Sequence, residues 1–129
     1  MNTLFTAIYT KYLASGLPAA GMTGLYNTEA PAGSAFPYGV FTMPDNSPDW
    51  TFTENFENCL IQFNLYSDNK TSPVNICSLF ELLKTAFDFV DLDITGYGSV
   101  SLVREIATLG RIDNVWDYMV RYRFLIEKD

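Results

Sequence analysis

The chain has 129 residues, of which 48% are hydrophobic and 16% aromatic, enough for one folded domain with a sizeable core. Its formal net charge of -7 argues against a basic surface for nucleic acid and against attraction to an anionic membrane. We find no apolar run long enough to span a bilayer and no secretion signal at the N-terminus, so we expect synthesis in the cytoplasm.

The first predicted element is a helix over residues 4–14. A set of apolar side chains recurs there at the spacing of one helical face, namely Phe5, Ile8, Tyr9, Tyr12 and Leu13. Gly16 and Pro18 follow as stop signals, so the helix should end before them.

Short strands are predicted next. Residues 23–28 and 37–43 carry the bulky and β-branched side chains that suit strands. Pro44 and Pro48 then predict that residues 44–49 form an irregular, turn-rich segment, because proline breaks regular structure.

Residues 52–66 predict a long strand, because apolar side chains alternate there with amides. Its apolar face carries Cys59, Ile61, Phe63 and Leu65. A second helix is expected over residues 73–90, with Ser72 as its cap and Pro73 in its first turn. The apolar face of that helix carries Ile76, Leu79, Phe80, Leu83, Phe87 and Val90.

Two strands, over residues 99–108 and 115–126, end the chain and are joined by a hairpin turn at Asp113-Asn114. In the last strand, bulky side chains occupy every second position, namely Trp116, Tyr118, Val120, Tyr122, Phe124 and Ile126. We expect this face to be buried against the second helix. The order of elements predicts a single α+β domain, residues 1–129, with two helices on one face of a mostly antiparallel sheet.

The residues that most often carry chemistry are scarce. The chain has no histidine, and its two cysteines, Cys59 and Cys77, are expected as buried thiols, although a disulfide between them stays open. Asp91 and Asp93 are expected in a solvated connection. No phosphate loop, nucleophile elbow or cofactor fingerprint is found. We therefore predict a protein that is not an enzyme, with no catalytic, cofactor-binding or metal-ligating residue and no cofactor.

Three arginines are candidate interface residues. Arg121 and Arg123 share the polar face of the last strand, and Arg104 is central to the strand expected beside it. One interpretation is a solvent-facing sheet surface balanced by Asp117 and Gln62. The other is an interface, because arginine forks pair well with carboxylates of a neighbouring subunit.

Two aromatic side chains, Trp50 and Phe52, are further candidates because they stand beside the proline-rich segment. They are either buried lids or anchors of an interface, where aromatic residues are enriched.

The whole chain resembles the small tail-terminator, or tail-completion, proteins of long-tailed bacteriophages and related prophages. The features that carry the resemblance are the helix over residues 4–14, the Phe36-Pro37-Tyr38 start of a strand and the long strand over residues 59–67. The helix that begins at Ser72-Pro73 and the closing strand over residues 116–124, followed by Glu127-Lys128, complete them.

The resemblance implies an α+β fold and a structural virion protein that caps the finished tail tube as a hexameric ring and joins it to the head. The implied partners are other copies of the chain, the major tail tube protein and the head–tail connector, with no sequence-specific nucleic acid and no membrane. The implied location is the host cytoplasm during assembly and then the virion tail. Three alternatives stay open: another head–tail neck or tail-tube component, a small-ligand-binding or regulatory α+β domain, and, against the prediction above, an enzyme that uses Asp and Arg side chains alone.

Overall fold

The computed structural model describes residues 2–50, 55–68, 73–90 and 92–128. These residues form two helices and five strands in the order α1 (Asn2–Ala14), β1 (Leu25–Asn27), β2 (Tyr38–Trp50), β3 (Asn55–Ser67), α2 (Val74–Phe87), β4 (Tyr97–Ile112) and β5 (Val115–Lys128). The strands make one sheet of order β1-β2-β3-β5-β4. Only the short β1–β2 pair is parallel, so the predicted α+β fold with a mostly antiparallel sheet is confirmed.

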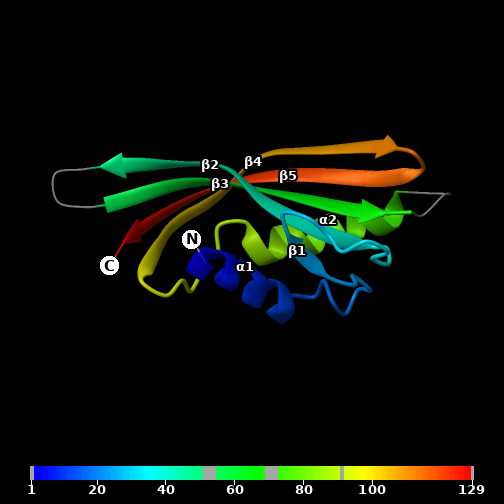
Figure 1. Ribbon diagram of the computed structural model, residues 1–129, viewed down its shortest axis with the longest axis horizontal. Helices are drawn as coiled ribbons and strands as arrows, with labels where there is room; N and C mark the ends of the chain where they lie inside the picture. Colours follow the sequence, from blue (N-terminus) through cyan, green and yellow to red (C-terminus); the bar gives the residue numbers. More distant parts are fainter. Residues whose placement is uncertain (1, 51–54, 69–72, 91, 129) are drawn as a thin grey trace.

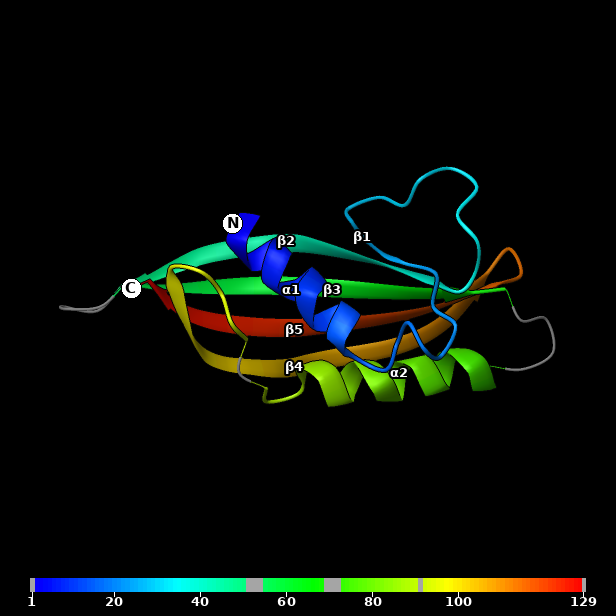
Figure 2. The same cartoon turned by 90° about the horizontal axis from the view of Figure 1, so that it is seen from below.

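Both helices lie on the same side of this sheet, as predicted (Figure 1). Seen from below, α1 crosses the strands obliquely while α2 runs alongside β4 (Figure 2). No described element covers the opposite side (Figure 1). One face of the sheet therefore packs against the helices to form the core, and the other face is not covered by any described element.

The core follows the alternation predicted for the two central strands. Cys59, Ile61, Phe63 and Leu65 of β3 and Val120, Tyr122, Phe124 and Ile126 of β5 are all fully buried. The Phe87 ring of α2 packs on them, 5.0 Å from the Phe63 ring and 6.4 Å from the Phe124 ring. Trp116 and Tyr118, nearer the hairpin turn, are only half-buried. The expected burial of this face is thus confirmed from Val120 onward.

The buried face of α1 differs from the predicted one. Leu4, Ala7, Ile8 and Tyr12 are buried, whereas Tyr9 and Leu13 are exposed. The buried side chains recur mainly every fourth residue, which gives a narrow stripe. Tyr9 and Leu13 lie beside that stripe because α1 contacts the sheet along one line only.

Strand β2 continues through the segment that its prolines had predicted to be irregular, so that prediction was wrong. Pro44 lies in the register shift between Thr42 and Asp45, and Pro48 is paired with Glu57 of β3. β1 pairs with β2 only as far as Phe41, so the rest of β2 is an edge of the sheet. Proline is tolerated there because an edge strand can turn its missing N–H away from the ladder.

The remaining elements are close to their predicted positions. α2 begins after Pro73, which has no side-chain capping bond, and ends before Val90; the proposed cap Ser72 lies outside the described residues. The predicted hairpin turn is confirmed, because Asp113 and Asn114 have φ angles of 52° and 65°. Two successive positive values characterise the type I′ turn, whose twist matches that of paired strands.

Candidate assembly surface

The face of the sheet opposite the helices, here called the uncovered face, is a candidate surface for contacts with other chains. Cross-strand pairs such as Gln62 with Arg121 and Leu60 with Arg123 place alternate residues of β3 and β5 on it. Its described side chains include Val40, Thr42, Leu60, Gln62, Asn64, Val103, Ile106, Thr108, Met119, Arg121 and Arg123. The uncovered face therefore combines amides and arginines with aliphatic groups. Such a composition is compatible both with exposure to water and with contact to another protein.

A chain of hydrogen bonds runs over the middle of the uncovered face. Arg121 Nε donates to Gln62 Oε1 at 2.8 Å, and Gln62 Nε2 donates to Asn64 Oδ1 at 2.8 Å. Asn64 Nδ2 in turn donates to Asp117 Oδ1 at 2.9 Å. The structure thus places Arg121 beside Gln62 and ends the chain at Asp117, as the interpretation of a charge-balanced sheet surface expected.

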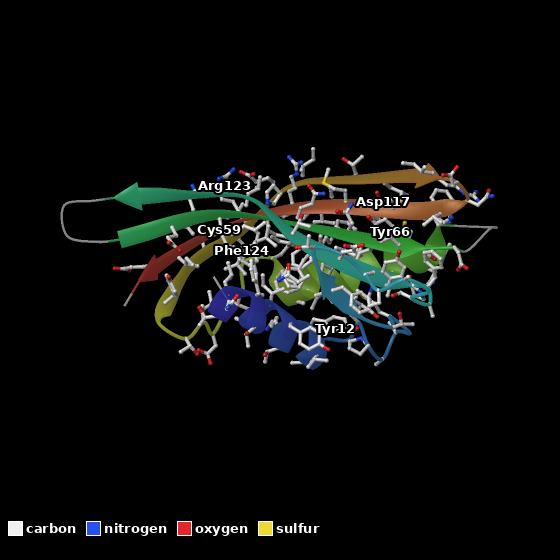
Figure 3. The ribbon with its side chains drawn as sticks, viewed as in Figure 1. Tyr12, Cys59, Tyr66, Asp117, Arg123 and Phe124 are labelled. Carbon is white, nitrogen blue, oxygen red and sulfur yellow. The ribbon has the colours of Figure 1, made fainter. Side chains whose placement is uncertain are left out.

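Arg123 links three strands on the same face. Its Nε lies 2.9 Å from Oε2 of Glu105 on β4, and its Nη1 donates to Asn58 Oδ1 on β3 at 2.8 Å. Figure 3 shows Arg123 on the uncovered side and Phe124 on the helix side. The Arg123 and Glu105 side chains are more than a third exposed, so this ion pair stabilises the fold only weakly. The guanidinium is accessible to a partner while it holds β3, β4 and β5 in register.

Arg104 lies on the other face, which corrects the grouping of three arginines on one polar surface. It stands across from the buried Tyr122, and its guanidinium lies 5.6 Å from the centre of the Phe80 ring of α2. Its Nε is 3.3 Å from both carboxylate oxygens of Asp88. Arg104 therefore ties β4 to the end of α2.

A β-bulge explains the position of Arg104. The register of β4 shifts between Arg104 and Ile106, so Glu105 is an extra residue. A bulge changes which side chains share a face, and the alternation before it cannot be continued past it. Ile106, opposite Arg121, is consequently the residue that joins the uncovered face.

Asp88 also accepts a hydrogen bond from the hydroxyl of Tyr122. Burial, and then the bond to Asp88, raise the pKa of Tyr122 well above its usual value. The Asp88 carboxylate is thereby held between a phenol and a guanidinium at the end of α2. Asp88, Tyr122 and Arg104 thus form a cluster between the end of α2 and β4. Because these side chains bind one another, the cluster suits a structural role.

Of the two aromatic candidates, the structure places only Trp50, which lies elsewhere. Trp50 is the last residue of β2 and pairs with Asn55, whereas Leu60 pairs with Arg123. Five residues of strand separate those positions, which is roughly 17 Å. Phe52 lies outside the described residues. The arginines and Trp50 are therefore not brought together into one cluster.

Sequence reasoning missed the outer edge of β4. Four of its side chains are exposed hydrophobics: Val103 (39%), Ile106 (47%), Leu109 (36%) and Ile112 (69%). Among the strand residues whose side chains the structure describes, no others are large exposed hydrophobics. The signal available in the sequence was a run of apolar residues without strict alternation, but its meaning depends on β4 being an edge, which only the sheet order reveals.

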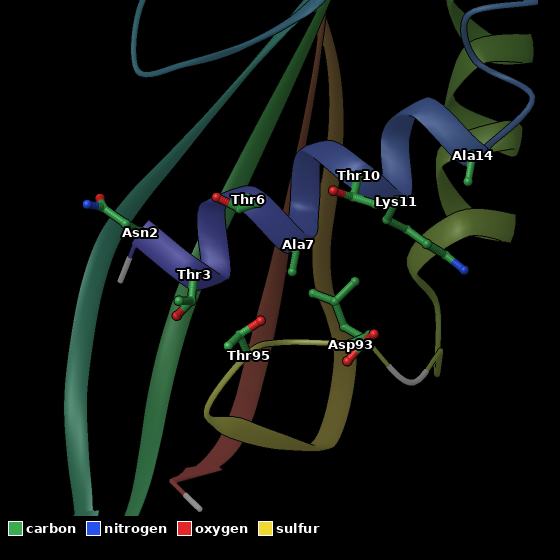
Figure 4. A pocket seen from close by; sticks show the side chains of 10 residues that line it. Asn2, Thr3, Thr6, Ala7, Thr10, Lys11, Ala14, Asp93 and Thr95 are labelled. Carbon is green, nitrogen blue, oxygen red and sulfur yellow. The ribbon is translucent and has the colours of Figure 1, made fainter.

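A depression of about 560 Å³ lies between α1 and the segment over residues 92–95 (Figure 4). Hydroxyl groups of Thr3, Thr6 and Thr10 line it, together with Lys11 and the exposed Asp93. Asp91 lies outside the described residues.

The described residues contain no group of three or more His, Cys, Asp or Glu side chains placed to hold a metal ion. Cys59 is buried and Cys77 is half-buried, and the two thiols do not form a disulfide. Within the same residues, neither helix has the length and apolar character needed to cross a membrane.

Comparison with known proteins gives information about the fold of the chain. No model of a protein family matches this sequence, and a search of curated proteins finds no match either. Among solved structures, a chain from the virion of a native gene transfer agent (GTA) particle is similar, with a TM-score of 0.84. The two chains are 18% identical, and the similarity covers 95% of this chain and 92% of that one. At this identity the likeness shows that the two chains share a fold over nearly their whole length.

Proposed function

We propose that this chain is a structural component of a phage-like virion, in which it forms a hexameric ring that caps the tail tube and joins the tail to the head. The observation that carries the proposal is the fold shared, end to end, with a chain of the GTA virion. It is supported by the resemblance of the sequence to tail-terminator proteins, which rests on different features. The partners are other copies of the chain, the major tail tube protein and the head–tail connector.

The architecture suits this role. A sheet whose helices all lie on one side offers a broad second face to a neighbour without disturbing the core (Figure 1). The net charge of -7 also suits a passage for DNA, because like charge keeps the phosphate backbone from binding to the wall.

We propose Arg121 and Arg123 as contact residues on the uncovered face, paired in the assembly with carboxylates of an adjacent subunit or of the tube. Arg104 is left out of this contact because Asp88 and Phe80 hold it on the helix side. Trp50, the last residue of β2, and Phe52, which lies outside the described residues, are proposed as anchors of a separate contact.

The experiment that tests the proposal is a measurement of mass and shape. Sedimentation equilibrium of the purified chain should give six times the 14.5 kDa mass of one copy, and negative-stain microscopy should show closed rings. A chain that remains monomeric or dimeric at every concentration, and that also fails to bind the ends of purified tail tubes, would contradict the proposal.

The alternatives give different results in the same experiment. A tube component would polymerise into long tubes, because its contacts repeat along the axis. A ligand-binding domain is the candidate that the depression beside α1 supports, since 560 Å³ is in the usual range for such sites. That domain would stay monomeric or dimeric and would bind a small molecule against Thr6 and Lys11.

A further inference from the structure

We infer that the outer edge of β4 in one copy docks against the flank formed by α1 and β1 in a second copy of this chain, with Leu109 at the pocket between those two elements. The inference rests on the proposed ring and deepens it, because it names the two surfaces that meet. Both surfaces consist of residues whose side chains the structure describes.

The outer edge of β4, over residues 106–112, has the chemistry of a surface that another chain covers. β4 is the last strand of the sheet, and no described strand pairs with its outer side. The segment contains no proline and no acidic residue, and three of its side chains are exposed hydrophobics: Ile106, Leu109 and Ile112. Natural proteins protect such an edge with charges, prolines or a covering element unless it is used for association.

Leu109 and Arg111 lie on the helix side of this edge. Leu109 stands opposite Tyr118, whose ring stacks on the Phe80 ring of α2 with 4.2 Å between the ring centres. Arg111 stands opposite Trp116, and its guanidinium lies 4.9 Å from the centre of that ring. An arginine on an aromatic ring is held in position and still presents N–H groups to a partner. The helix side of the segment is therefore apolar with one fixed positive charge.

The flank formed by α1 and β1 offers an apolar receiving surface. A pocket of about 270 Å³ lies there, lined by Phe5, Thr6, Tyr9, Leu25, Asn27 and Phe41. Tyr9 is 44% exposed, and Leu13, one turn further along α1, is 56% exposed. A cavity of about 150 Å³ can hold a benzene ring, so this pocket has room for a leucine side chain. Anchors that fill such pockets provide much of the binding energy of protein interfaces.

The two surfaces carry opposite charges. Glu29 is exposed, and its N–H donates to the carbonyl of Asn27, a residue of the pocket wall, at 2.8 Å. Lys11, the one basic residue of α1, lines depressions on the other side of that helix. The flank is therefore acidic, whereas the edge of β4 is basic through Arg111. Complementary charges favour the correct partner and speed its approach.

The positions of the two surfaces suit a closed ring. β1 and β4 lie at opposite edges of the sheet, so a copy that has docked its β4 edge still offers its own α1–β1 flank. Leu25 of β1 is connected to Leu109 of β4 by a row of cross-strand partners, namely Gly39, Leu65 and Tyr118. The surfaces are thus at the same height, and copies can join side by side with no shift along their strands. Such a repeated contact closes when its rotation fits, whereas one that does not close gives a helical filament.

Filling the pocket and shortening the anchor test the contact. Thr6→Trp fills the pocket and should lower the association constant of the ring by about tenfold or more, as should Leu109→Ala. Both changes in one chain should cost less than the product of the separate effects, because the shorter side chain leaves space for the indole. Thr10→Trp, one turn along α1 and outside this pocket, should leave assembly unaltered. Circular dichroism of each variant checks that the fold is kept.

A charge exchange should give a smaller effect. Glu29→Lys should lower the association constant by about threefold, since charges at the rim of an interface interact through water. Adding Arg111→Glu to the same chain should restore most of that loss. Asp68→Lys makes the same change in net charge just after β3, away from both surfaces, and should leave assembly unaltered.

Cysteine cross-linking gives a further readout, in a Cys77→Ser background that removes the half-buried thiol. A chain with both Asn27→Cys and Thr108→Cys should form a ladder of covalent multimers on oxidation, and each single variant should not. Dimers from Thr108→Cys alone would mean a β4–β4 contact and overturn the inference. Rings that form without any ladder, and that tolerate Thr6→Trp, would overturn it while leaving the proposed function standing. A chain that neither assembles nor binds the ends of tail tubes contradicts both.

Discussion

The two faces of β5 show how differently neighbouring residues of one strand are used. Tyr122 and Phe124 are fully buried beneath α2, whereas Arg121 and Arg123, one position away, are half-exposed and bound to polar side chains of β3 and β4. Hydrophobic packing on the helix side provides most of the stability. The uncovered side contributes little energy to the fold, so its chemistry can serve contacts with other chains. Substitutions should separate the two roles.

The largest effect is expected from Phe124→Ala. Phe124 is fully buried and packs against Phe87 and Tyr122, so its removal leaves a cavity that the rigid sheet cannot fill. Unfolding in urea should show a loss of roughly 3–5 kcal/mol. The neighbouring Arg123→Ala should cost less than about 1 kcal/mol. Equal losses for the two variants would mean that the faces do not differ as described.

Tyr122→Phe should have an intermediate effect. The change keeps the ring and removes only the hydroxyl that donates to Asp88, and a hydrogen bond to a charged group is worth about 1.5–3 kcal/mol. Denaturant unfolding at neutral pH measures this loss. Asp88→Asn, which keeps an acceptor near Tyr122 but loses the charge facing Arg104, is the matched comparison.

The same hydroxyl predicts a dependence on pH. Because the pKa of Tyr122 is raised in the folded protein from its ordinary value of 10.0, the unfolded chain loses the proton first as the pH rises. Stability should therefore be complete below about pH 10 and fall above it. Tyr122→Phe should fall less steeply over this range, though not be flat, since the pKa values of Tyr12, Tyr66 and Tyr118 are raised too. Unfolding free energies measured from pH 8 to about pH 11 test this.

A small effect on stability is expected from Arg121→Glu combined with Arg123→Glu. Both side chains point away from the core, so the free energy of unfolding should change by no more than about 1–2 kcal/mol. Under the proposed function, the same variant should lose much of its ability to form rings or to join tail tubes. Sedimentation and tube binding measure this loss. A variant that completes tails normally would remove these arginines from the proposed contact.

The predictions from sequence succeeded where local periodicity and tertiary structure agree. The alternation in β3 and β5 identified the buried face, and Asp113-Asn114 identified the hairpin turn. They failed where the local structure depends on residues elsewhere in the chain. Pro44 and Pro48 lie in strand β2 because β2 pairs with β3. The face of Arg104 could not be predicted, because the bulge at Glu105 has no sequence signature. The apolar edge of β4 was missed for a related reason, since sheet order depends on contacts between residues far apart in the chain.

The turn at Asp113 and Asn114 has a further consequence for the time course of folding. The β4–β5 hairpin pairs residues that are close in the chain, whereas β3 must wait for α2 and β4 to be placed before it meets β5. Local hairpins close in microseconds, and contacts across long loops form later. We therefore expect the apolar edge of β4 to be complete before the core beneath it. A newly synthesised chain would then expose the apolar edge of β4 early in folding. The fraction of the protein that aggregates should therefore rise with the concentration of incompletely folded chains.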